Sequence, residues 1–285
     1  MKKSSLILIP CLILSFCLAL RTGQALAQEP LRLGLYPYLA ATELVKKFSP
    51  LAAYLGQQLG QPVTLEIAQS YQMHIDRMGK EELELAFMGP ISYVEMTERF
   101  GAKPILAGFA INGHATFQGM IVVKKECALH GLADLKGKRF AFGSADSTMG
   151  FFLPRLLLHQ AGVEITSLAS YAHIANQQNV ALGVLMGNFD AGAIREAVFK
   201  AYEHEGLRAL AISPPLPEHL FVAAKRLGSK KTLALAKAMQ ALNQATPNGR
   251  AILSTLQTDL TALVPIEDQA YQELRIMYRA AEAHE

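Results

Sequence analysis

The chain has 285 residues, of which 51% are hydrophobic and 18% are charged, and it carries a formal net charge of +3. This length accommodates one large domain or two modest ones. A charge so close to zero does not support a basic protein that binds nucleic acid.

The N-terminus has the pattern of a secretory signal peptide. Lys2-Lys3 forms the charged start, residues 6–20 form an apolar core, and Ala25-Leu26-Ala27 offers small residues for cleavage. We therefore predict an exported protein that is cleaved after Ala27, with residues 1–27 as the signal peptide. An uncleaved anchor is the alternative, although the apolar core is short for a membrane span and Arg21 follows it closely.

Cleavage changes both the charge and the cysteine count. Three of the 27 Lys and Arg residues and none of the 24 acids lie before residue 28, so the mature chain carries 24 of each. Two of the three cysteines lie there too, and Cys127 remains. A single cysteine forms no internal disulfide, so the folded core must supply the stability of the exported protein.

The first half of the mature chain alternates short strands with helices. We expect strands at 31–36, 63–67, 83–88 and 105–109, and helices at 42–59, up to Met78 and from Ile91 to about Arg99. Such alternation at short spacing is typical of a parallel α/β sheet. Pro50 lies inside the first helical pattern, where it should bend the helix or mark its true start.

The pattern restarts after an apolar strand at 118–123. We expect further strands at 139–142, 169–173, 191–194, 207–212 and 220–223, helices at 179–186 and 196–202, and a helical remainder at 230–245, 249–255 and 266–281. The segment Pro214-Pro215-Leu216-Pro217 forces an extended crossing.

Two α/β units therefore follow one another, and the chain crosses between them near 116–119 and again near 213–217. Two crossings predict a discontinuous first lobe, residues 28–117 and 215–285, and a second lobe of residues 118–214. A cleft between such lobes lies at the carboxyl ends of strands, where open α/β sheets bind ligands.

A loop of small and hydroxylated residues, 143–150, joins a predicted strand to a predicted helix. Free backbone N–H groups and the positive end of the helix dipole favour an anion there, and Ser147 and Thr148 add hydroxyl donors. The alternative is that Asp146, Ser147 or Thr148 only caps the helix. Pro154 lies too deep for a helix that starts at Ser147 to run through unbroken, so we expect a separate first turn or a kink.

The loops after three strands should meet in the cleft, at Ser70-Tyr71, at Ser92-Tyr93 and at Ser147-Thr148. The two tyrosines and Ser92 are therefore candidate ligand contacts. Half-buried structural tyrosines with satisfied hydroxyls are the alternative.

Five segments resemble the phosphonate/phosphite/phosphate substrate-binding proteins of ABC transporters. They lie at 88–93, 146–154, 179–185, 190–193 and 213–217. The similarity covers nearly all of the mature chain in the same order. It implies an α/β periplasmic binding protein with two lobes, a hinge and an interlobe cleft. Such a protein captures a small phosphorus oxyanion (phosphite, phosphonate or phosphate), delivers it to an ABC permease and needs no cofactor.

The resemblance also implies roles for particular residues. In this family a Ser/Thr-rich loop holds the phosphorus oxygens, which selects Ser147 and Thr148. A tyrosine from the first lobe contacts the ligand, and Tyr71 sits at the equivalent place. Some relatives carry a third hydroxyl where this chain has Met149, which makes one wall of the site apolar.

Further positions carry over with alternatives. A family histidine maps onto either His173 or Gln177, and Asp190 is a candidate contact that could instead cap a turn. Relatives that bind aminoalkylphosphonates place acids where this chain has His219 and, one position out of register, Glu196. We therefore expect phosphite or a simple alkylphosphonate to bind more tightly than 2-aminoethylphosphonate.

Enzymes, metal proteins and sensors are the competing classes. Ser147, His173 and Asp190 could be imagined as a catalytic triad, but the chain has no Gly-x-Ser-x-Gly elbow. The histidines are scattered and Cys127 with His130 is a lone pair, so we expect no metal site. The same fold could also sense a ligand for a membrane sensor kinase, and neighbouring genes would distinguish that role from transport.

Overall fold

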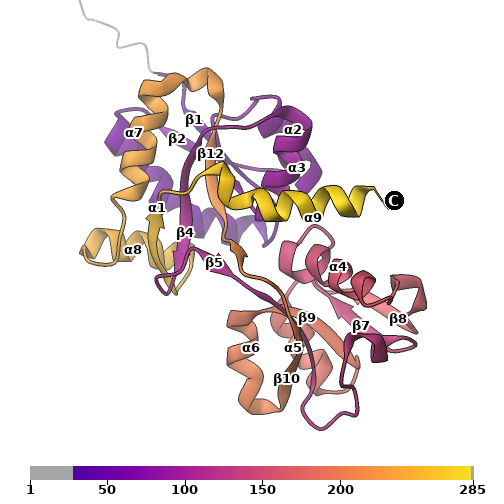
Figure 1. The fold of residues 1–285 in the computed structure, drawn as a ribbon. Coiled ribbons are helices and arrows are strands. Elements are labelled where there is room, and N and C mark those ends of the chain that lie inside the picture. The colour runs from indigo at the N-terminus through magenta and orange to yellow at the C-terminus, as the bar shows by residue number, and fades with distance from the viewer. Residues whose placement is uncertain (1–27, 284–285) are drawn as a thin grey trace, which may run out of the picture.

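A computed structural model describes residues 28–283, so the predicted signal peptide lies outside the described residues. The described residues form two α/β lobes, each built on its own mixed sheet (Figure 1). Between residues 28 and 283, no helix has both the length and the apolar character that crossing a membrane requires.

The first lobe contains a six-stranded sheet of order β13-β4-β12-β3-β1-β2. Its strands are β1 (Leu31–Leu35), β2 (Val63–Ile67), β3 (Leu85–Met88), β4 (Ile105–Ile111), β12 (Leu220–Ala223) and β13 (Leu260–Val264). Strand β1 pairs in parallel with β2 and β3, whereas β12 and β13 pair antiparallel with their neighbours. The four strands expected in the first half thus run in one direction, and the sheet is mixed because β12 and β13, which was not expected, run the opposite way.

Six helices cover this sheet. They are α1 (Ala41–Leu59), α2 (Tyr71–Gly79), α3 (Pro90–Phe100), α7 (Gly228–Gln240), α8 (Pro247–Leu256) and α9 (Gln272–Glu282). Helix α1 starts well before Pro50 and continues through it, so Pro50 does not mark its start. The helix tolerates the lost N–H because it buries Leu44, Phe48 and Leu55 in the core of the lobe.

The second lobe contains a five-stranded sheet of order β10-β6-β9-β7-β8. Its strands are β6 (Gly119–Lys124), β7 (Arg139–Phe142), β8 (Ser170–His173), β9 (Ala191–Arg195) and β10 (Leu207–Ile212), and its helices are α4 (Leu153–Gln160), α5 (Gln177–Leu185) and α6 (Glu196–Tyr202). A π-helical turn, Thr148–Phe152, precedes α4, and Pro154 lies in the first turn of α4. The expected separate first turn before Pro154 is thus confirmed.

The chain crosses between the lobes at two short strands that pair with each other. Strand β5 (Thr116–Phe117) and strand β11 (Leu216–Pro217) run antiparallel, with Leu216 opposite Phe117. Figure 1 shows β5 in the connection between the lobes. These two strands form a sheet separate from both lobes.

Apolar side chains also join the lobes, and we call this set the bridging cluster. Its members are Met149, Phe152, Leu153 and Leu156 of the second lobe and Leu216, Leu220, Tyr271 and Leu274, which precede or belong to β12 and α9. Helix α9 extends over α4 in Figure 1. The rings of Phe152 and Tyr278 lie 6.3 Å apart, centroid to centroid, and extend this contact.

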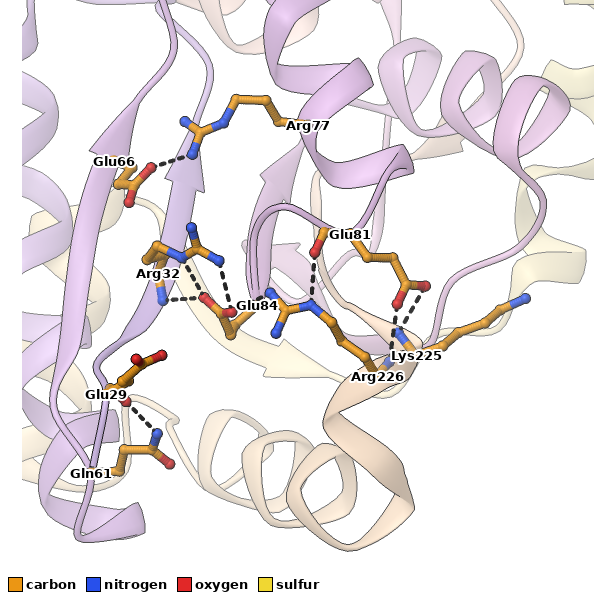
Figure 2. A network of polar contacts seen from close by, with 9 residues as sticks. All are labelled: Glu29, Arg32, Gln61, Glu66, Arg77, Glu81, Glu84, Lys225 and Arg226. Atoms are coloured by element: carbon orange, nitrogen blue, oxygen red, sulfur yellow. Dashed lines mark hydrogen bonds and ion pairs between the residues drawn. The ribbon is translucent and has the colours of Figure 1, made fainter. Parts of the chain in front are cut away.

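A polar network ties the strand ends of the first lobe that lie away from the cleft (Figure 2). The buried carboxylate of Glu84 accepts hydrogen bonds from the Arg32 backbone N–H at 2.9 Å, from the Arg32 guanidinium and from Arg226. Burial alone would raise the pKa of Glu84, but these hydrogen bonds hold it at about 2. Glu84 therefore remains ionised and fastens the start of β1 to the segment after β12.

Candidate functional site

A cavity of about 610 Å³ lies between the two lobes. Most of its lining follows strands that run in parallel. In the first lobe these residues are 36–40 after β1, Tyr71 after β2, and Gly89 and Ser92 after β3. In the second lobe they are Ser144 and 146–149 after β7, 175–178 after β8, and Arg195 at the end of β9. The carboxyl edges of two sheets thus face one space, which is where open α/β sheets bind ligands.

The hydroxylated loop contributes both hydroxyl and backbone donors to this cavity. The Oγ atom of Ser147 accepts a hydrogen bond from the Gly150 N–H at 3.0 Å, so Ser147 does cap the π-helical turn. The Oγ1 atom of Thr148 accepts from the Ile91 N–H of α3 at 3.1 Å. Each hydroxyl uses a lone pair in these bonds, and its own proton stays available. Among the described residues, the backbone N–H groups of Thr148 and Met149 also have no hydrogen-bond partner.

Close backbone contact fixes the shape of this loop. The Gly143 N–H donates to the Gly150 carbonyl at 2.7 Å, and a Cβ on Gly143 would lie 2.8 Å from the Gly150 Cα. The imidazole Nδ1 of His173 lies 2.9 Å from the Gly143 carbonyl and donates to it. These contacts hold the donors of the loop in place before a ligand arrives.

Three tyrosines line the opposite wall, on the first lobe. The Tyr36 ring centroid lies 4.9 Å from that of Tyr38 and 4.7 Å from that of Tyr71. Within residues 28–283 none of the three hydroxyls forms a hydrogen bond. Burial raises the pKa of each hydroxyl, so all three stay protonated donors at neutral pH.

His219 contributes an oriented imidazole. Its ring stacks on Phe87 at a centroid distance of 5.3 Å, and its Nδ1 lies 2.8 Å from the buried carboxylate of Glu218. A carboxylate only accepts, so Nδ1 carries the proton and Nε2 is left for other partners. A Cβ on Gly89 would lie 3.8 Å from this Nε2, which places it near the start of α3.

Three charged side chains line the cavity: Lys47 of α1, Asp146 of the hydroxylated loop, and Arg195. Burial and the nearby charge of Arg195 lower the pKa of Lys47. Burial raises the pKa of Asp146. Among the described residues, neither Lys47 nor Arg195 forms an ion pair through its side chain.

Seven of the ten residues proposed from the sequence line the cavity. They are Tyr71, Ser92, Ser147, Thr148, Met149, Gln177 and His219. Of the two alternatives for the family histidine, Gln177 lies in the lining, and its Oε1 accepts from the Arg195 N–H at 3.0 Å. Direct contact of these residues with a ligand stays a prediction.

The other three do not line the cavity, so the structure gives no support for them as ligand contacts. Tyr93 is fully buried and donates to Asp268 at 2.7 Å, because neighbouring residues on a helix point about 100° apart and Ser92 takes the cavity side. Asp190 precedes β9, so it lies where that strand begins, whereas the cavity lies where the strand ends. Its carboxylate pairs with the Arg139 guanidinium at 2.8 Å. His173 is the last residue of the edge strand β8 and supports the loop from outside the lining.

Four further residues line the cavity that were not predicted from the sequence, namely Tyr36, Tyr38, Lys47 and Arg195. The sequence carries a signal for Tyr36, Tyr38 and Arg195, because each lies at the end of a predicted strand or just after one. Lys47 carried none, since it lies within a helix among other charged residues. Over the described part of the chain, no group of three His, Cys, Asp or Glu side chains is placed to hold a metal ion.

Comparison with known proteins places these features in context. A family model described as "ABC transporter, phosphonate, periplasmic substrate-binding protein" matches residues 33–271. A probable ABC transporter phosphite binding protein, PhnD1, from Prochlorococcus marinus is 28% identical over 178 residues, which cover 60% of this chain and 59% of that protein. A phosphate-import protein, PhnD, from Mycolicibacterium smegmatis is 28% identical over 175 residues, which cover 58% and 54%. Each match thus spans less than two thirds of the relative.

Solved structures agree on the fold. The structure of Prochlorococcus marinus PhnD1 in complex with methylphosphonate superposes with a TM-score of 0.74 and 24% identity, over 88% of this chain and 98% of that chain. The protein XAC2383 from Xanthomonas citri gives a TM-score of 0.76 with 18% identity, over 89% and 98%.

Proposed function

Because the chain belongs to the family of phosphonate periplasmic substrate-binding proteins of ABC transporters, we propose that its interlobe cavity captures a small phosphorus oxyanion for delivery to an ABC permease. Membership confirms the resemblance seen in the sequence, and the two-lobe α/β fold agrees with it. Members of this family are substrate-binding transport proteins.

One observation carries the proposal, namely that the hydroxylated loop of the second lobe meets the start of α3 at the cavity, where the Thr148 Oγ1 accepts from the Ile91 N–H at 3.1 Å. Two helix starts then direct donors and positive dipole ends toward one point, an arrangement that favours an anion. The protons of Ser147 and Thr148 and the N–H groups of Thr148 and Met149 can reach several oxygens at once. A phosphorus centre that carries three oxygens suits such a set of donors.

The same geometry argues against the triad that the sequence had allowed. Ser147 is engaged with Gly150, the Nδ1 of His173 is engaged with the Gly143 carbonyl, and Asp190 pairs with Arg139 on the far edge of the sheet. A serine nucleophile needs its base within hydrogen-bond reach and the acid behind that base. These three side chains are not arranged for nucleophilic catalysis.

Calorimetry of the purified mature protein against phosphate, phosphite, methylphosphonate and sulfate tests the proposal. We expect at least one phosphorus oxyanion to bind, and Ser147→Ala to weaken it about tenfold or more. Ser254→Ala is the matched control, because Ser254 lies on the surface of α8 and bonds only to a carbonyl of its own helix. Failure of every phosphorus oxyanion to bind would refute the proposal.

The proposal includes the location of the protein and its moving parts. Export to the periplasm with cleavage after Ala27 gives a mature protein that begins at Gln28, which mass spectrometry of the exported protein can check. The lobes, residues 28–117 with 215–285 and residues 118–214, move about the crossings at β5 and β11. Small-angle scattering with and without ligand measures that motion.

A further inference from the structure

The cavity is larger than a bare phosphorus oxyanion needs. Such an ion has four heavy atoms in phosphite, whose fourth substituent is hydrogen, and five in phosphate or methylphosphonate. The cavity volume of about 610 Å³ falls in the range of about 300–1,000 Å³ that is typical of sites for drug-sized ligands. A phosphorus group held at the hydroxylated loop would therefore leave room for a substituent.

The charged groups lie at different parts of the cavity. The charge of Asp146, in the hydroxylated loop, acts on Tyr71. The charge of Arg195 acts instead on Tyr36, Tyr38 and Lys47. The hydroxylated loop bonds to the start of α3 through Thr148, and its Met149 packs in the same core cluster as Val94 of α3. Lys47 instead lies on α1, whose Phe48 packs in the other core cluster of the first lobe. The hydroxylated loop and Lys47 therefore belong to opposite ends of the cavity, and the charge of Arg195 acts at the Lys47 end. Tyr36, whose ring contacts both other tyrosine rings, lies between the two ends.

The end away from the hydroxylated loop holds two cations, Lys47 and Arg195, that form no ion pair with any residue the structure describes. Lys47 comes from the first lobe and Arg195 from the second, and the charge of Arg195 lowers the pKa of Lys47. Glu43, one turn earlier on α1, acts on Lys47, but among the described residues it forms no ion pair with it. The carboxylate of Glu196, next to Arg195, forms an ion pair with Lys200 at 2.6 Å. An anion placed between Lys47 and Arg195 would relieve their repulsion and their loss of hydration.

We propose, on the premise of the proposed function, that the preferred ligand is an organophosphonate whose substituent ends in a second anionic group. The phosphonate lies at Ser147 and Thr148, the substituent lies against Tyr36 and Tyr38, and the second anion lies between Lys47 and Arg195. Arg195 is then a specificity-determining residue, because its guanidinium can donate two parallel hydrogen bonds to a carboxylate. The same two cations disfavour a ligand that ends in an ammonium group.

The test compares ligands on the unmodified mature protein, so it does not depend on any variant. By calorimetry, 3-phosphonopropionate should bind at least tenfold more tightly than 3-phosphonopropionamide, which has the same shape without the second charge. It should also bind more tightly than 2-aminoethylphosphonate. Raising the salt concentration should narrow the difference between the acid and the amide.

Variants then assign the effect to residues. Arg195→Gln and Lys47→Gln should each weaken binding of the acid and reduce its preference over the amide at least threefold. Lys46→Gln is the matched control, because it removes the same charge from the neighbouring, exposed position of α1 and should change neither value.

The outcomes separate this inference from the proposed function. Equal binding of the acid and the amide, beside clear binding of methylphosphonate, would overturn the inference and leave the proposed function intact. A preference for the acid that survives in both the Arg195 and the Lys47 variants would also overturn it. If no phosphorus compound binds at all, the proposed function itself fails.

Discussion

Replacing Thr148 by valine tests a single atom, Oγ1, which we expect to form hydrogen bonds both to the first lobe and to the ligand. Thr148 is 6% exposed, and its Oγ1 accepts from the Ile91 N–H at 3.1 Å. Valine keeps the shape of the side chain and removes only this hydroxyl. The ligand then loses a charge-assisted hydrogen bond of about 1.5–3 kcal/mol, which corresponds to about ten- to a hundredfold in Kd.

The same change leaves the Ile91 N–H without its acceptor, at a cost of about 1–3 kcal/mol if water does not replace it. Calorimetry measures the first effect and thermal unfolding without ligand measures the second. Thr148→Ser is the matched control, since it keeps Oγ1 and should bind within about threefold of the parent. If valine lowers the melting temperature but leaves Kd unchanged within twofold, Thr148 only links the lobes and the reasoning about its proton is wrong.

Three further predictions concern the fold and the corrected site. Glu84→Gln should lower the free energy of unfolding at pH 7 by about 3 kcal/mol, because the pKa of Glu84 is depressed in the folded protein. For the same reason the parent should lose this contribution as the pH falls from about 4.5 to about 2. Urea unfolding at several pH values measures both, and an equal loss in Glu66→Gln, whose pair with Arg77 is more exposed, would contradict the role of burial. Gly143→Ala should weaken ligand binding more than tenfold because its Cβ would collide with Gly150, whereas Gly131→Ala meets no atom within 4 Å and should have no effect in the same calorimetric assay. Tyr93→Phe should lower stability by breaking the bond to Asp268 yet leave Kd unchanged, and a large change in Kd would return Tyr93 to the site.

The hydroxylated loop could be predicted because its chemistry is local. A strand, a run of small and hydroxylated residues, and a helix start follow one another in the sequence, and Pro154 alone indicated the separate turn at Thr148–Phe152. The choice between Ser92 and Tyr93 was not local in this sense. Both lie in the first turn of α3, and only the packing of that helix decides which side chain faces the cavity.

Lys47 and Arg195 show a different limit of prediction from sequence. Both side chains line one cavity only because the two lobes lie across the cleft from each other, although the two residues are about 150 positions apart in the chain. No periodicity in either segment records that distance. Strand β13 was missed for a related reason, since a short apolar run between helices becomes a strand only because the edge of β4 is free to pair with it.

The bridging cluster adds a free-energy cost to separating the two lobes. Separating the lobes would expose Phe152, Leu153 and Leu156 to water, and each 100 Å² of apolar surface exposed costs about 2.5 kcal/mol, a shift of about seventyfold in population. Burial of these side chains therefore contributes to the stability of the shape shown in Figure 1 relative to an open one. The ligand does not have to supply that part of the free energy of closure. Release of the ligand has the opposite requirement, because a partner that opens the lobes to empty the cavity must keep these side chains apart.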